Sequence, residues 1–207
     1  WACNFPAQGP LRAGLSARAL VSGGRTRCYL VHVPPDYSPT APIPLVFALH
    51  GFASAPDMLQ YMSDWDTVAD RETALVVYGQ GTSFPLRWNV APDPSVPGVD
   101  DVQYLRDILG ELGRMATIDP ARIYVSGYSN GGALTIRTAC EMADTVAAVA
   151  TVAAPYPDLG DSCQPARPVP LMAFHGTDDR VVAYGGGEIQ LAPALARLFN
   201  VGPQAQH

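Results

Sequence analysis

From residue 43 onward, short apolar runs alternate with longer segments of helical periodicity. Residues 43–50 and 74–78 are nearly continuous apolar runs, which is typical of strands buried on both faces. The segments 55–72 and 100–117, one after each of these runs, are predicted to be helices, the second with an Asp at its start. This alternation predicts an α/β fold with a mostly parallel central sheet and helices on both faces.

The remaining segments extend the same pattern to both ends of the chain. Before residue 43, the segments 15–21 and 25–33 flank Ser22-Gly23-Gly24 and predict an antiparallel hairpin at one edge of the sheet. One domain over residues 1–207 is expected. The other predicted elements are strands at 122–126, 146–153 and 171–175 and helices at 130–142 and 188–199.

Composition excludes several classes of protein. The chain has 207 residues, of which 48% are hydrophobic and only 15% charged, so it is not intrinsically disordered. No apolar run approaches the roughly 18 residues that a membrane span needs. The 13 basic residues are all arginine and the net charge is −6, so a nucleic-acid partner is not expected. A monomer is expected.

The four cysteines are widely spaced, at Cys3, Cys28, Cys140 and Cys163. They form no C-x-x-C pair and have no histidine at ligand spacing, so no metal site is expected. Their even number predicts two disulfides and a secreted protein. Of the three possible connectivities, the local pairing Cys3–Cys28 and Cys140–Cys163 is preferred. The alternative is four free thiols in a cytosolic protein.

The stretch Gly127-Tyr128-Ser129-Asn130-Gly131 lies where an apolar strand ends and a helix begins. This context predicts that Ser129 is a nucleophile raised on a sharp turn, where neighbours without side chains avoid collisions. The backbone N–H of Asn130 is then predicted to be one donor to the oxyanion. The alternative is a tight glycine-rich turn with an incidental serine.

A second strand end, after residues 43–50, supplies the other half of an oxyanion hole. The backbone N–H of Phe52, or of its neighbour Ala53, is predicted to be the second donor. His50 is expected to order this loop through hydrogen bonds rather than to act in catalysis, since it precedes Ser129 on a different strand.

A third strand end, after residues 171–175, offers a carboxylate. Asp178 and Asp179 are both placed where an acid accepts a hydrogen bond from a catalytic histidine. The alternative is that both aspartates only form the loop or cap an element.

Together these segments resemble the polyhydroxybutyrate depolymerase and feruloyl esterase family of secreted α/β-hydrolases. The resemblance covers roughly residues 15–187. It implies that Ser129 is the nucleophile, that Asp179 rather than Asp178 is the acid, and that carboxylic esters are hydrolysed without a metal or organic cofactor. The segments that carry it are Leu49-His50-Gly51, Gly127-Tyr128-Ser129-Asn130-Gly131-Gly132 and His175-Gly176-Thr177 with Asp179 and Val182.

The catalytic histidine is the part of the triad that the sequence defines least. In this fold it follows the acid, and His207 is the only histidine after Asp179, so His207 is the candidate base. The resemblance implies a histidine after one more strand, but no strand is predicted between residues 188 and 207. A chain that lacks the last strand, with its base elsewhere, is therefore preferred over His207 as the base.

Aromatic residues at the same sheet edge are candidates for the substrate cleft. Trp88 and Tyr128, with Phe52 and Tyr184, would line it; the alternative is that each packs the edge of the core. The short segment 154–170 shows no lid-length apolar insertion, which favours an open cleft that suits bulky or polymeric esters.

The sequence thus predicts a secreted serine esterase acting on feruloyl or cinnamoyl, acetyl or polyhydroxyalkanoate-type esters through an acyl-enzyme on Ser129. Two alternatives stay open. One is a serine peptidase of the same fold. The other is a non-catalytic relative that binds a polymer or protein through the same cleft, which the lack of a histidine after a predicted further strand favours.

Overall fold

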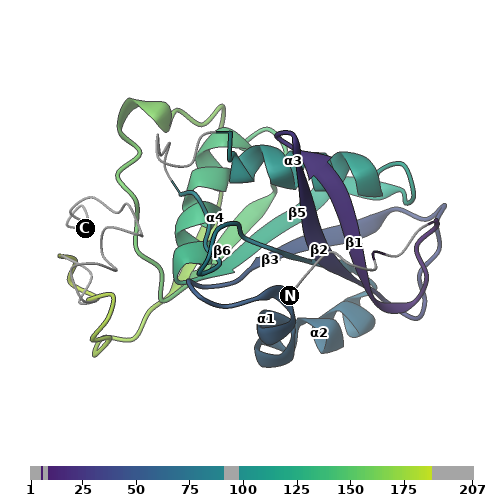
Figure 1. Cartoon of the computed structure of the whole chain (residues 1–207), viewed down its shortest axis with the longest axis horizontal. Helices are drawn as coiled ribbons and strands as arrows, with labels where there is room; N and C mark the ends of the chain where they lie inside the picture. The colour runs from purple at the N-terminus through teal and green to yellow at the C-terminus, as the bar shows by residue number, and fades with distance from the viewer. Residues whose placement is uncertain (1–5, 7–8, 91–97, 188–207) are drawn as a thin grey trace.

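The computed structural model describes residues 6, 9–90 and 98–187, and this part of the chain forms a seven-stranded sheet (Figure 1). The strand order is β1-β2-β4-β3-β5-β6-β7. Strands β3 to β7 are parallel, whereas β2 runs antiparallel to both β1 and β4. The strands are Gly14–Ser22 (β1), Arg25–Val33 (β2), Ile43–Leu49 (β3), Leu75–Gly79 (β4), Ile118–Tyr128 (β5), Ala148–Val152 (β6) and Leu171–Phe174 (β7). The predicted mostly parallel sheet with an antiparallel hairpin is therefore confirmed.

Helices cover both faces of the sheet, as predicted. Figure 1 shows α1 and α2 on one face and α3 and α4 on the other. No helix in residues 6, 9–90 and 98–187 is long and apolar enough to cross a membrane. The helices are Pro56–Ser63 (α1), Trp65–Glu72 (α2), Asp101–Leu112 (α3) and Asn130–Glu141 (α4), with a short 3₁₀ turn at Gly160–Ser162 (η1).

Alternate residues of the central strand β3 point into two separate cores. Leu45 and Phe47 pack on the side of α3 and α4, where the larger core lies. Val46 and Ala48 face the other way and pack with residues of α1 and α2. Burial on both faces explains why this strand is a continuous apolar run in the sequence.

Three elements differ from the prediction by more than two residues. The helix predicted over 55–72 is two helices, because Asp64 between them adopts a left-handed conformation with φ 54°. The helix predicted over 100–117 ends at Leu112, followed by Gly113. Strand β5 begins at Ile118 rather than at residue 122. The helix predicted at 188–199 lies outside the described residues.

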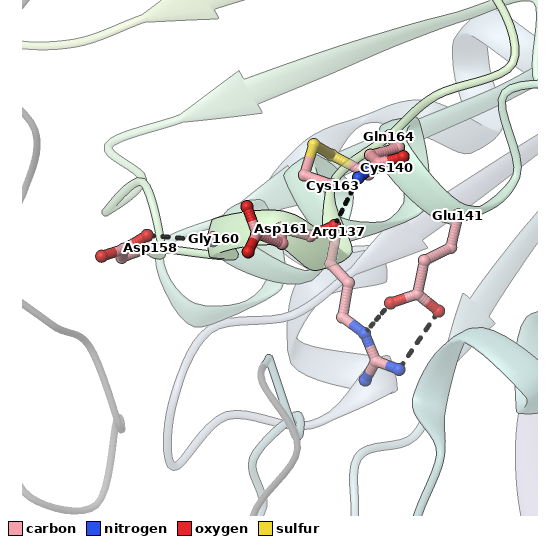
Figure 2. The surroundings of a disulfide bond; sticks show 8 residues. All are labelled: Arg137, Cys140, Glu141, Asp158, Gly160, Asp161, Cys163 and Gln164. Carbon is pink, nitrogen blue, oxygen red and sulfur yellow. Dashed lines mark hydrogen bonds and ion pairs between the residues drawn. A yellow bond between two sulfur atoms is a disulfide. The ribbon is translucent and has the colours of Figure 1, made fainter.

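A disulfide joins Cys140 near the end of α4 to Cys163 after η1, with the two Cα atoms 5.0 Å apart (Figure 2). On the same helix, Arg137 donates to both carboxylate oxygens of Glu141, at 2.6 and 3.2 Å. This confirms the predicted Cys140–Cys163 pair. Cys28 is also disulfide-bonded, and its predicted partner Cys3 lies outside the described residues.

Candidate active site

Ser129 forms a strained corner between β5 and α4. It has φ 54° and ψ −120°, a conformation that non-glycine residues rarely adopt. Its backbone N–H donates to the carbonyl of Val152 at 2.9 Å, which ties the corner to the end of β6. The chain turns tightly here: a Cβ on Gly127 would lie 2.2 Å from the carbonyl oxygen of Gly131. Only glycine at position 127 permits this approach.

The corner places Asn130 at the first position of α4. The first N–H groups of a helix have no partner within the helix, and the positive end of the helix dipole lies there. Both properties suit the stabilisation of a developing negative charge beside Ser129. The predicted first oxyanion donor is therefore at a helix start, directly after the strained serine.

The loop after β3 lies beside this corner. A Cβ on Gly51 would lie 2.9 Å from the ring of Tyr128 and 3.4 Å from Cβ of Ser129, so the two turns are in close contact. The N–H of Ala53 donates to the carbonyl of Leu86 at 2.8 Å, and so it is already engaged. Phe52, the residue before Ala53, stays the predicted second donor.

His50 holds this loop in place through hydrogen bonds of its ring, as expected. Its side chain is fully buried. Nδ1 lies 2.7 Å from the carbonyl oxygen of Gly51, and Nε2 accepts the N–H of Gly81 at 3.0 Å. Burial lowers the pKa of His50 to about 4. A neutral ring that donates through Nδ1–H and accepts at Nε2 satisfies both contacts.

Asp179 is held in a tight loop after β7. Its Oδ1 accepts the N–H groups of Val181 at 2.8 Å and Val182 at 3.0 Å, and these bonds lower the pKa of this carboxyl. Its Oδ2 lies 3.5 Å from Nε2 of His175. The neighbouring Asp178 is exposed and makes no hydrogen bond with the described residues. Of the two aspartates, Asp179 is thus the oriented one.

The three described histidines all have partners other than Ser129. Nε2 of His32 lies 2.7 Å from Oδ1 of Asp70, and Nδ1 of His50 lies 2.7 Å from the carbonyl oxygen of Gly51. Nε2 of His175 donates to the carbonyl of Val182 at 2.7 Å. Within the described ranges, no imidazole is hydrogen-bonded to Ser129. The predicted base His207 lies outside those ranges.

The two predicted cleft residues lie in different environments. Tyr128 is 43% exposed, whereas Trp88 is only 2% exposed and belongs to the core. The ring of Trp88 lies 4.9 Å from that of His50 and 6.4 Å from that of Tyr104, between centroids. In this structure Trp88 faces the interior behind the loop after β3.

Trp88 and Asn130 are connected by hydrogen bonds that the sequence does not predict. The indole Nε1–H of Trp88 donates to the carbonyl of His50 at 2.7 Å. The Trp88 backbone N–H donates to Oδ1 of Asn130 at 2.7 Å, and Nδ2 of Asn130 donates to the Trp88 carbonyl at 3.4 Å. The residues are 42 and 38 positions apart, so no local sequence pattern signals these bonds.

A buried ion pair anchors the far end of the loop that carries Trp88. Asp101 is fully buried and accepts from Arg27 at 2.6 Å and from the N–H of Asn89 at 2.6 Å. The Arg27 guanidinium also stacks 3.8 Å above the ring of Tyr104. Arg137 of α4 donates to the carbonyl of Asn89 at 3.0 Å. The loop is thus bonded to α3 and α4 just beyond Trp88.

An apolar groove of about 590 Å³ lies beside the corner, between α1 and α2 on one side and β5 to β7 on the other. Tyr128, Val152 and Phe174 line it, and Met172 and Leu59 lie further along. Ser129 is not among its lining residues.

The chain is similar in sequence to several esterases, although no family model matches it. It is 34% identical to feruloyl esterase B of Piromyces equi, over 80% of this chain and 31% of the relative. It is 32% identical to the bifunctional acetylxylan esterase/xylanase XynS20E of Neocallimastix patriciarum, over 78% of this chain and 22% of the relative. It is 28% identical to poly(3-hydroxyalkanoate) depolymerase C of Paucimonas lemoignei, over 60% of this chain and 31% of the relative. The chain thus spans less than a third of each of these relatives.

Solved structures share the same arrangement of strands and helices. The acetyl xylan esterase from Aspergillus awamori superposes with a TM-score of 0.60 at 15% identity, over 73% of this chain and 57% of that one. A thermostable esterase superposes with a TM-score of 0.62 at 24% identity, over 82% and 48%. Such neighbours confirm the predicted α/β-hydrolase fold.

Proposed function

We propose that this chain hydrolyses carboxylic esters through an acyl-enzyme on Ser129. The observation that carries the proposal is the strained Ser129, with φ 54°, between the parallel strand β5 and the start of α4. A serine held in this way presents its hydroxyl at a sharp strand-to-helix turn. The similarity to proteins named feruloyl esterase, acetylxylan esterase and poly(3-hydroxyalkanoate) depolymerase supports ester hydrolysis.

The reaction follows from the chemistry of these groups. The Ser129 Oγ attacks the ester carbonyl carbon while the base, for which His207 is the candidate, takes its proton. The N–H groups of Asn130 and Phe52 donate to the oxyanion of the tetrahedral intermediate. The intermediate expels the alcohol, which takes the proton from the base. Water, deprotonated by the same base, then releases the acid and regenerates the serine. Asp179 accepts a hydrogen bond from the base and stabilises its protonated form.

The proposed substrates are small or polymeric esters of feruloyl or cinnamoyl, acetyl or polyhydroxyalkanoate type. We also propose that the protein is secreted, a monomer and free of cofactors. All cysteines in the described ranges are disulfide-bonded, which supports an oxidising compartment. An open cleft favours short acyl chains. Butyrate nitrophenyl esters should be hydrolysed faster than palmitate esters, and the reverse order would contradict this substrate class.

A fluorophosphonate probe tests the nucleophile directly. The wild-type chain should be labelled on Ser129, as located by mass spectrometry, and should hydrolyse nitrophenyl butyrate. Ser129→Ala should abolish both reactions. Ser126→Ala is the matched control, since Ser126 lies three residues earlier, on β5, and it should keep both. Label on another residue, or full activity of Ser129→Ala, would refute the proposal.

A non-catalytic binding protein is the second candidate, because each of the three described histidines is bonded away from Ser129. His207→Ala distinguishes the two functions. If His207 is the base, this variant should lose about 10³-fold or more in kcat. Full retention of activity would exclude His207 as the base. A wild-type chain that takes no label and hydrolyses no ester would instead favour the binding protein.

A further inference from the structure

We propose that the buried Trp88 is a positioning residue that sets the distance between the two halves of the oxyanion hole. This inference rests on the proposed function, since it concerns the hole that Asn130 and Phe52 are predicted to form. Trp88 itself touches no substrate: it is 2% exposed and lies behind the site.

The physical problem is that the two predicted donors come from different strand ends. Asn130 follows β5, whereas Phe52 follows β3. Both N–H groups must reach one oxygen at about 2.7–3.1 Å, and an error of about 0.5 Å is enough to weaken the site. Something must therefore fix one turn relative to the other.

Trp88 is bonded to both turns at once. Its indole N–H donates to the carbonyl of His50, two residues before Phe52, at 2.7 Å. Its backbone N–H donates to the side chain of Asn130 at 2.7 Å. Both bonds are buried, where competition from water is small and a hydrogen bond is electrostatically stronger. One residue thus spans the gap between the two donors.

The rest of the loop strengthens the connection to the β3 side. The N–H of Gly81 donates to Nε2 of His50 at 3.0 Å, and the carbonyl of Leu86 accepts from Ala53 at 2.8 Å. The residues of the β3 turn are therefore held on both sides of Phe52. Since the His50 ring is neutral, with its pKa at about 4, the Gly81 contact persists across the working range of an esterase.

The Asn130 side chain has a role separate from its backbone N–H. It is 1% exposed, so its amide needs partners inside the protein. It finds them in the N–H and the carbonyl of Trp88, at 2.7 and 3.4 Å. The residue after the nucleophile therefore contributes its N–H to the predicted hole and its side chain to the positioning of Trp88.

The test removes each bond and separates binding from chemistry. Trp88→Phe deletes the indole donor and keeps an aromatic ring, and Asn130→Ala deletes both side-chain bonds. Each should lower kcat by about 10- to 100-fold and leave KM within about threefold, because donors to the oxyanion act in the transition state. The rate of fluorophosphonate labelling should fall in parallel. The double variant should lose less than the product of the two single losses, because both act through Trp88.

Tyr37→Phe is the matched control. Tyr37 also donates from an aromatic side chain to a backbone carbonyl, that of Met115 at 3.0 Å, but near the start of β3 rather than at its end. It should lose stability without losing kcat. All variants are assayed well below their thermal midpoints, and Asn130→Ala decides the question if Trp88→Phe does not fold.

If the folded variants keep the wild-type kcat, or differ from the wild type only in KM, the role of Trp88 is overturned. Labelling of the wild-type Ser129 would in that case still uphold the proposed function. A wild type that takes no label and hydrolyses no ester would overturn both.

Discussion

Gly131 lies directly against the carbonyl of Leu49: a Cβ at position 131 would be 2.3 Å from that oxygen and 2.5 Å from the oxygen of His50. The start of α4 and the end of β3 are thus in backbone contact. This contact places the strained Ser129 beside the loop after β3, and it depends on the absence of a side chain.

The first prediction concerns this contact. Gly131→Ala forces a methyl group into two backbone oxygens that cannot rotate away, so it should cost about 3 kcal/mol or more of unfolding free energy. Gly110→Ala is the matched control, because Gly110 lies in α3 with no atom within 4 Å of a Cβ. It should instead stabilise the protein by about 0.5–1 kcal/mol. Urea unfolding measures the free energy of unfolding of both variants. Equal changes in the two would contradict the close contact of Gly131 with the end of β3.

The second prediction separates the two aspartates. Asp179→Asn keeps an oxygen for the N–H groups of Val181 and Val182, so the loop should be preserved, but it removes the charge that stabilises a protonated base. In the proposed mechanism kcat should fall by about 10⁴-fold. Asp178→Asn changes an exposed neighbour and should leave kcat within about threefold. If Asp178→Asn shows the larger loss in steady-state assays, Asp179 is not the acid.

The third prediction is a pH dependence of stability that originates at His50. Burial lowers its pKa from 6.5 to about 4, so between these values the unfolded chain binds a proton that the folded chain does not. The contribution of His50 to stability should be complete above about pH 6.5 and should decrease as the pH falls towards 4. The difference in thermal midpoint between wild type and His50→Gln should therefore be largest at pH 7. Melting curves recorded from pH 4.5 to 7 test this, and a constant difference would show that His50 is not buried as a neutral ring.

The fourth prediction concerns the disulfide between Cys140 and Cys163, which are 23 residues apart. A cross-link of this span restricts the unfolded chain, and the double variant Cys140→Ala/Cys163→Ala should lose about 3 kcal/mol. For a domain of this size, that loss corresponds to a decrease of roughly 6–12 °C in thermal midpoint. Calorimetry of the double variant checks the value. A midpoint within about 1 °C of the wild type would mean that the cross-link adds little.

The order of strands and helices could be predicted because burial leaves a direct record in the sequence. Strands covered on both faces, such as β3 and β4, need apolar side chains at every position. The break between α1 and α2 left no such record. It depends on one left-handed residue, Asp64, in a segment with the composition of a continuous helix. Similarly, Asp119 and Pro120 resemble turn residues, although β5 continues through them.

The strand-to-helix corner at Ser129 could be predicted because it depends on local chain geometry. The strand-to-helix corner at Ser129 requires glycines at fixed positions, and the sequence displays them. The contacts of Trp88 with His50 and Asn130 depend instead on how distant segments pack. Spacing alone places Trp88 near the site but does not distinguish the cleft from the interior behind it.

Strand β7 has a consequence for how the protein behaves in solution. The apolar side chains of Leu171, Met172 and Phe174 are each about half exposed, and β7 ends the sheet within the described residues. The outer amides and carbonyls of such a strand can pair with a strand of another molecule. Leu171 does not line the groove beside Ser129, so Leu171→Lys should lower light scattering from concentrated samples relative to the wild type while leaving Ser129 chemistry intact.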